Sequence, residues 1–168
     1  MPEPQDIVGV TACEDRWTQG DPMRWKLLNA DPPVTYAVAL STGDDVVKLL
    51  GKFIREREIE GASVTAIGAF SDAIVGYFDW QTKQYKKIPV PEQVEVLSLL
   101  GDVAVAEDGP VLHLHAVLGR SDGSTVGGHL LAAQVRPTLE VIFIQTPSYM
   151  RKRHDPETGL ALLALNPA

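Results

Sequence analysis

Hydrophobic positions early in the chain follow a helical period and predict one helix. Between residues 44 and 58, apolar side chains recur every three or four residues, and most of the charged ones fall on the opposite face. Thr42 and Asp45 have the spacing of a capping box, which places the start of the helix close to Thr42, and Gly61 lies where such a helix would end. The apolar face consists of Val46, Leu49, Leu50, Phe53 and Ile54.

Alternating and short apolar runs elsewhere in the chain predict strands. Their turns are short, and short turns favour antiparallel pairing because parallel strands need long crossover connections. We therefore expect an α+β fold, a single domain with a large, mostly antiparallel β-sheet covered by helices. The expected strands are 25–28, 36–40, 62–69, 73–79, 84–88, 94–100, 111–118, 129–135 and 139–145. Of these, 111–118 and 129–135 are expected to be neighbours, with the helix on their apolar face.

The 168 residues fit one domain, which we divide into three segments. Residues 1–33, rich in Pro and Asp, are expected to form a partly ordered N-terminal arm, and residues 34–150 the domain itself. Residues 151–168 are expected to be a C-terminal extension that packs on the domain. It begins with the charged run Arg151-Lys152-Arg153-His154, which we interpret mainly as a solvated face, with contact to an anion as the second reading.

Charge and composition narrow the classes of function. There are 15 basic and 22 acidic residues, a net charge of −7, whereas a protein that grips nucleic-acid phosphates usually has a basic face. The single cysteine, Cys13, allows no intrachain disulfide. No signal peptide and no apolar run of the ~20 residues needed to cross a bilayer are visible, so we expect a cytoplasmic protein without a membrane partner.

Two histidines share one face of an expected strand. In 111–118, His113 and His115 alternate with Leu112, Leu114, Ala116 and Leu118, which are suited to a core. Because alternate side chains of a strand point to the same side, the two imidazoles lie next to each other.

A third histidine, His129, follows Gly127-Gly128, and glycines permit close approach of backbones. Three imidazoles with one open position are the ligand set of catalytic zinc sites. His113, His115 and His129 are therefore candidate metal ligands. The spacing is also compatible with hydrogen-bonded interior histidines or with half of a subunit contact, and His154 is expected to be exposed and unrelated.

Glu95 is the candidate catalytic carboxylate. It lies at the start of an expected strand, where it could serve as a general base, a fourth ligand or a partner that orients an imidazole. The alternative is a solvated carboxylate at a strand edge, and this alternative is stronger for the neighbouring Glu92.

Several motifs, taken in order, resemble the PPC (plants and prokaryotes conserved) domain, also described as a predicted DNA-binding domain. The resemblance covers roughly residues 34–146. The segments that carry it are 66–79, 95–102, 108–110, 113–115, 122–123, 127–130 and 138–141.

The resemblance implies an α/β domain with a large, mostly antiparallel sheet, and for stand-alone prokaryotic members a homotrimer. It also implies a metal, zinc, held by the histidines that match His113, His115 and His129. In plants the domain accompanies AT-hooks that contact DNA, but this sequence has no Arg-Gly-Arg-Pro hook.

Three hypotheses about function follow. The first is a zinc-binding homotrimer, potentially a small metal-dependent enzyme such as a hydrolase or lyase that acts on a small molecule. The second is a non-enzymatic oligomeric binding module, and the third is a DNA-associated regulator, which the net charge disfavours.

Overall fold

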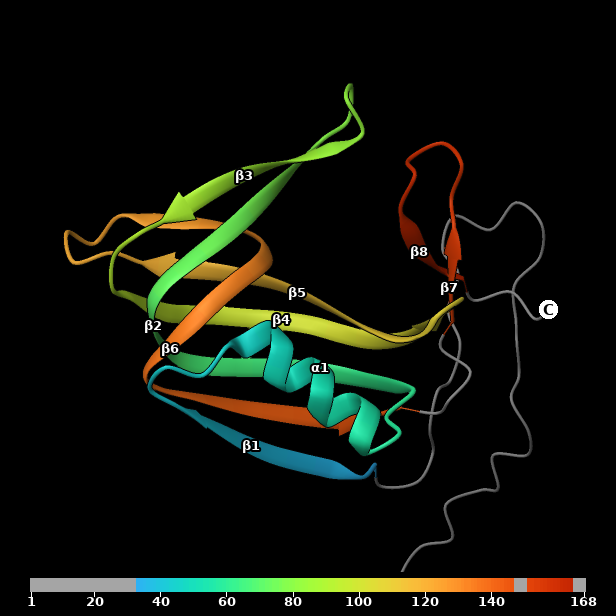
Figure 1. Ribbon diagram of the computed structural model, residues 1–168, viewed down its shortest axis with the longest axis horizontal. Helices are drawn as coiled ribbons and strands as arrows, with labels where there is room; N and C mark the ends of the chain where they lie inside the picture. Colours follow the sequence, from blue (N-terminus) through green and yellow to red (C-terminus); the bar gives the residue numbers. More distant parts are fainter. Residues whose placement is uncertain (1–32, 147–150, 165–168) are drawn as a thin grey trace, which may run out of the picture.

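The structure, a computed structural model, describes residues 33–146 and 151–164 (Figure 1). The strand expected at 25–28, Cys13 and nearly all of the proposed N-terminal arm lie outside the described residues.

Helix α1 spans Val46–Glu56, within the range expected from the sequence. It begins three residues later than the capping box indicated, because Asp45 is the N-cap and its carboxylate accepts a hydrogen bond from the backbone N–H of Lys48 at 3.0 Å. Thr42 instead donates its hydroxyl to the carbonyl of Pro137. Gly61 begins the next strand rather than ending the helix.

Eight strands make up the rest of the described chain. Their bounds are β1 Thr35–Ser41, β2 Gly61–Asp79, β3 Gln84–Val90, β4 Val94–Ala106, β5 Gly109–Gly119, β6 Thr125–Gln145, β7 Arg151–His154 and β8 Ala161–Ala164.

The strands form one sheet that closes on itself. β2 pairs with β6, β6 with β5, β5 with β4, and β4 again with β2, all antiparallel. β1 is added to β6 and β3 to β2, while the β7–β8 hairpin joins β4 through a parallel bridge at Val105 and Arg151. The sheet is therefore mixed, with antiparallel pairing everywhere except at this bridge.

Two pairs of expected strands are single long strands. β2 runs through Ser71-Asp72 and β6 through Arg136-Pro137, where the sequence had suggested turns. Shifts of register such as the one between Gly68 and Phe70 let β2 bend without ending. Only residues 115–119 of β5 pair with β6, at 125–129, while residues 130–135 pair with β2, so the expected pairing of 111–118 with 129–135 is only partly right.

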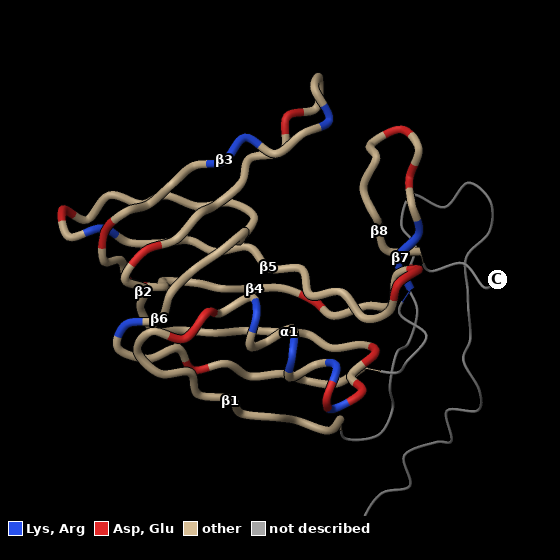
Figure 2. Tube along the Cα trace, viewed as in Figure 1, with Lys and Arg blue, Asp and Glu red and all other residues tan. Residues whose placement is uncertain are grey.

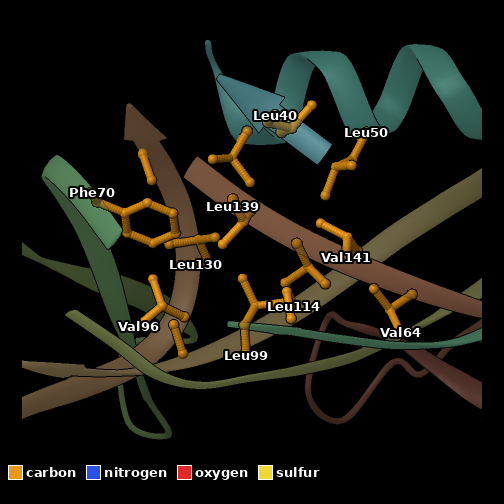
Figure 3. Packing of buried hydrophobic residues seen from close by; sticks show 14 of the residues in the cluster. Leu40, Leu50, Val64, Phe70, Val96, Leu99, Leu114, Leu130, Leu139 and Val141 are labelled. Atoms are coloured by element: carbon orange, nitrogen blue, oxygen red, sulfur yellow. The ribbon is translucent and has the colours of Figure 1, made fainter. Parts of the chain in front are cut away.

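The hydrophobic core lies inside the curved sheet and under α1 (Figure 3). Leu50 of α1 is fully buried and points toward Leu139 and Val141 of β6, and Phe70, Leu99 and Leu114 lie in the same cluster. Within residues 33–146 and 151–164, α1 is the only helix, so the expected covering of the sheet by helices is only partly supported. One helix suffices because the sheet covers much of the core itself.

Charged residues of both signs are spread over the loops, α1 and β3 (Figure 2). The part of the chain that the structure describes has no helix long and apolar enough to cross a membrane.

Candidate metal centre

The three candidate histidines come together on the outward face of the sheet. His115 of β5 lies directly opposite His129 of β6, and residues opposite each other on antiparallel strands project to the same side. His113 is two residues before His115 and shares its face, while Leu114 between them is buried in the core. The alternation seen in the sequence therefore separates the imidazoles from the apolar interior.

The glycine pair before His129 is required by close packing. A Cβ atom on Gly128 would lie 2.6 Å from the carbonyl oxygen of Gly76, and one on Gly127 would lie 2.8 Å from that of Ala116. His129 itself pairs with Gly76 of β2 on one side and with His115 on the other. The glycines thus let β6 pass between two strands and bring His129 to the other histidines.

The separations within this cluster of His113, His115 and His129 are suited to a metal ion. One ring nitrogen from each residue lies within 4.8 Å of the other two. The ring centroids are 5.0, 5.1 and 5.5 Å apart. Nitrogen ligands placed tetrahedrally 2.0–2.1 Å from zinc would lie about 3.3 Å from one another. The three ring nitrogens would therefore need to approach by up to roughly 1.5 Å, a distance that side-chain rotation supplies.

An aspartate that the sequence analysis missed orients one of the imidazoles. Asp102 of β4 lies directly opposite His113, and its Oδ2 is 3.3 Å from the Nδ1 of that ring. This contact leaves the Nε2 of His113 available. Histidine ligands commonly give their second nitrogen to a carboxylate in this way, which fixes the ring and raises its basicity.

The position of Asp102 opposite His113 could have been predicted from the register of the β4–β5 hairpin. Glu107 and Asp108 connect Ala106 and Gly109, which are paired. Counting back from this two-residue connection places Asp102 opposite His113. The expected strands 94–100 and 111–118 left this register open, so Asp102 was not among the candidate residues.

The electrostatics of the cluster favour neutral imidazoles. Burial, followed by the neighbouring His113, His115 and Lys152, lowers the pKa of His129 to about 4. Burial and then His113 also lower the pKa of His115. Burial alone would raise the pKa of Asp102, but hydrogen bonds from His113 and Lys152 outweigh it and the pKa is lowered. The site therefore combines uncharged rings at His115 and His129 with an ionised carboxylate at Asp102 near neutral pH.

Lys152 corrects the reading of the C-terminal charged run as a solvated face. Its side chain is only 6% exposed, and its Nζ lies 2.8 Å from Oδ1 of Asp102. The neighbours Arg151 and Arg153 are exposed, as is His154, as expected. The side chain of Lys152 on β7 thus points inward and contacts Asp102, which in turn contacts His113. Nothing in the local sequence distinguishes Lys152 from its neighbours, because its burial depends on where the hairpin meets β4.

A pocket of about 250 Å³ adjoins the histidines. His113, His129 and Lys152 contribute to its polar lining, and Tyr85 of β3 stacks against His129 with ring centroids 4.8 Å apart. The rest of the lining is aliphatic and comes from β5 and from the chain around β8: Val111, Leu112, Leu160, Ala161 and Leu162.

Glu95 does not join the histidines within the chain. It is exposed and pairs with Gly119, four residues or roughly 13 Å along β5 from His115. Glu92 accepts a hydrogen bond from Nε of Arg120 at 3.0 Å on the same part of the surface. Asp102 therefore lies where it can orient an imidazole, which was one of the three roles considered for Glu95.

Solved structures of other proteins resemble this chain closely. The metal-containing protein AF0104 of Archaeoglobus fulgidus is 33% identical, with a TM-score of 0.75, over 83% of this chain and 99% of the other. A plant- and prokaryote-conserved (PPC) protein of Pyrococcus horikoshii is 28% identical, with a TM-score of 0.74, over 80% and 94%. A protein of Bacteroides thetaiotaomicron that has been suggested to bind DNA is 30% identical, with a TM-score of 0.74, over 77% and 91%.

A curated relative contains a similar segment within a much longer protein. The bifunctional protein GlmU of Synechococcus sp. is 32% identical over 127 residues, which make up 74% of this chain. This chain spans only 19% of the length of that relative.

The family expected from the sequence motifs is confirmed. The family model of the Plants and Prokaryotes Conserved (PCC) domain matches residues 29–147, which include α1 and the strands β5 and β6 that carry the three candidate ligands. This chain therefore belongs to the Plants and Prokaryotes Conserved domain family.

Proposed function

We propose that this protein binds a divalent metal ion, zinc, through His113, His115 and His129. The observation that supports the proposal is the convergence of the three ring nitrogens within 4.8 Å of one another. Imidazole is a ligand that zinc prefers, and three protein ligands leave one position for water or for a ligand molecule. The relative from Archaeoglobus fulgidus is described as metal-containing, which agrees with this assignment.

Two further observations fit a metal at this position. Nδ1 of His129 is buried and has no hydrogen-bond partner among the described residues. A buried polar atom without a partner is costly, and either a metal or a bound water would remove that cost. Asp102 in turn holds the ring of His113 through Nδ1.

We propose that the open metal position and the adjoining pocket accept a small molecule. A bound zinc ion would act there as a Lewis acid or lower the pKa of a water molecule. A hydrolase or lyase reaction is the enzymatic form of this proposal. A non-enzymatic binding module would use the same pocket without turnover.

We also propose that the protein assembles as a homotrimer through the outward face of its sheet. A row of directly paired residues crosses this face from Ile142 through Thr65 and Leu100 to His115. Exposed apolar patches of this kind often mark contacts between proteins. The exposed aliphatic residues around the row are Ile67, Leu97, Leu100, Val117, Ile142 and Ile144.

A DNA-associated role is less favoured. The relative from Bacteroides thetaiotaomicron has been suggested to bind DNA. The net charge of −7 opposes approach to phosphates, and the described lysines and arginines are dispersed among acidic residues (Figure 2). Fluorescence anisotropy with duplex DNA should show no nanomolar affinity at physiological salt, and such an affinity would reverse this ranking.

Metal analysis of untagged protein tests the proposed metal site. The wild type should contain about one zinc ion per chain, and His115→Ala should lose it while circular dichroism shows that the fold remains. His154→Ala is the matched control, because His154 is exposed on β7 and should not affect the metal content. Equal metal content in all three proteins, or none in the wild type after exposure to zinc, would refute the proposal.

A further inference from the structure

The β7–β8 hairpin brings a buried lysine to the edge of the candidate metal centre. Residues 151–164 lie beyond the residues 29–147 that match the family. Lys152 is the one member of the basic run whose side chain turns inward, where Nζ lies 2.8 Å from Oδ1 of Asp102. This chain thus adds a cation to the site from outside the matched region.

Lys152 has hydrogen-bonding capacity beyond its contact with Asp102. A lysine ammonium has three N–H donors, and the structure gives Asp102 as its single charged partner among the described residues. Burying an ammonium group is costly unless its donors are satisfied. Lys152 also lines the pocket beside His113 and His129, so its remaining donors have a place to bind a ligand.

The pocket combines positive charge with apolar walls. No Asp or Glu is among its lining residues, although Asp102 contacts both Lys152 and His113. Aliphatic side chains from β5 and from the hairpin, such as Leu112 and Leu162, form the opposite wall. Its volume of about 250 Å³ corresponds to roughly eight groups of the size of a water molecule, at about 30 Å³ each.

We infer that the pocket binds a small organic carboxylate, whose charged end is recognised by Lys152 and whose short apolar part contacts Leu112 and Leu162. This inference rests on the proposed metal site insofar as the metal would hold the same carboxylate from the other side. Lys152 is then the residue that determines specificity for an anion over a neutral molecule.

Calorimetric titration of zinc-loaded protein with 3-methylbutanoate and with its neutral analogue 3-methylbutanamide tests the inference. The wild type should bind the carboxylate at least about tenfold more tightly than the amide, because charge-assisted hydrogen bonds are the stronger kind. Lys152→Met should remove that preference and leave amide binding unchanged. Arg153→Met, which removes an exposed charge from the same strand, should retain the preference. Inorganic phosphate in a parallel titration should bind more weakly than the carboxylate.

A second variant guards against unfolding of the hairpin. Lys152→Met leaves Asp102 without its cation, so Asp102→Asn/Lys152→Met removes both charges together and, with enough zinc present to offset the weaker binding expected of Asp102→Asn, should show the same loss of preference. Equal binding of carboxylate and amide by the wild type, tighter binding of phosphate than of the carboxylate, or equal losses in Lys152→Met and Arg153→Met, would overturn the inference.

Failure of the metal site is distinguishable from failure of this inference. Metal content is measured on the same samples, and the titrations are repeated on metal-free protein. A Lys152-dependent preference for the carboxylate in a protein that takes up no zinc would refute the metal site and support the pocket. Its absence in both forms would refute the pocket whatever the metal content.

Discussion

Nδ1 of His113 lies 3.3 Å from Oδ2 of Asp102, the residue directly opposite it on β4. Such a contact fixes the ring so that the other nitrogen faces the metal position. Asp102→Asn should therefore weaken zinc binding about 10- to 100-fold, as measured by competition with a chelating dye. Glu95→Gln should leave zinc affinity unchanged, because Glu95 is distant from the cluster. The reverse ranking would restore Glu95 as the orienting carboxylate.

Gly128→Ala should disturb both stability and the metal site. The added Cβ would lie 2.6 Å from the Gly76 carbonyl oxygen, which is backbone and cannot rotate away. We expect a loss of more than about 1 kcal/mol in the free energy of unfolding, measured with urea, together with weaker zinc binding.

Gly51→Ala is the control for this prediction. Gly51 lies within α1, and the nearest atom to its added Cβ is the end of the Arg55 side chain at 3.5 Å. Alanine favours helix over glycine, so this variant should be as stable as the wild type or up to about 1 kcal/mol more stable. Equal effects of the two substitutions would contradict the packing argument.

The metal-free protein should lose stability as the pH falls from about 6.5 to about 4. The pKa of His129 is about 4 in the folded chain against 6.5 for an unperturbed histidine, so the unfolded chain binds more protons in this interval and is favoured by acid. The difference between these two pKa values corresponds to about 3 kcal/mol, and screening by water at this partly exposed ring reduces that to roughly 1–2 kcal/mol. Urea denaturation of His129→Gln should show a weaker dependence on pH over the same interval.

Ile67→Glu should dissociate the proposed trimer. Ile67 is 62% exposed on the apolar outward face, so the charge should harm contact between copies much more than the fold of one copy. Light scattering should report a change from three chains to one. Trp80→Glu, at a side chain that is 56% exposed beside the β2–β3 turn, should leave the assembly intact. A wild-type monomer at micromolar concentration would contradict the proposed assembly.

Local periodicity was sufficient to predict the helix and most strands, because each pattern reports burial on one face. It failed at Ser71-Asp72 and Arg136-Pro137, which lie at shifts of register inside long strands whose flanking residues are paired. Turn propensity is a local preference, and the pairing of β2 with β6 outweighs it.

The residues of the candidate site also differ in whether local sequence or strand pairing reveals them. His113 and His115 share a face by alternation alone, and the glycines before His129 indicated close packing. To predict Asp102 as part of the site, one needs the register of the β4–β5 hairpin. To predict Lys152, one needs to know how the β7–β8 hairpin meets β4. Candidate metal ligands can thus be predicted from local sequence, whereas the residues that contact and orient them depend on pairing between strands.

The outward position of the three histidines separates metal exchange from folding. Their rings project away from the cluster that contains Leu114, Leu118 and Leu130, and the apolar interior closes without them. A chelator should therefore remove the ion and leave a folded chain, unlike small domains in which the metal replaces a core. Occupancy of the proposed site in the cell would then follow the supply of free metal, and its loss under metal scarcity would be reversible.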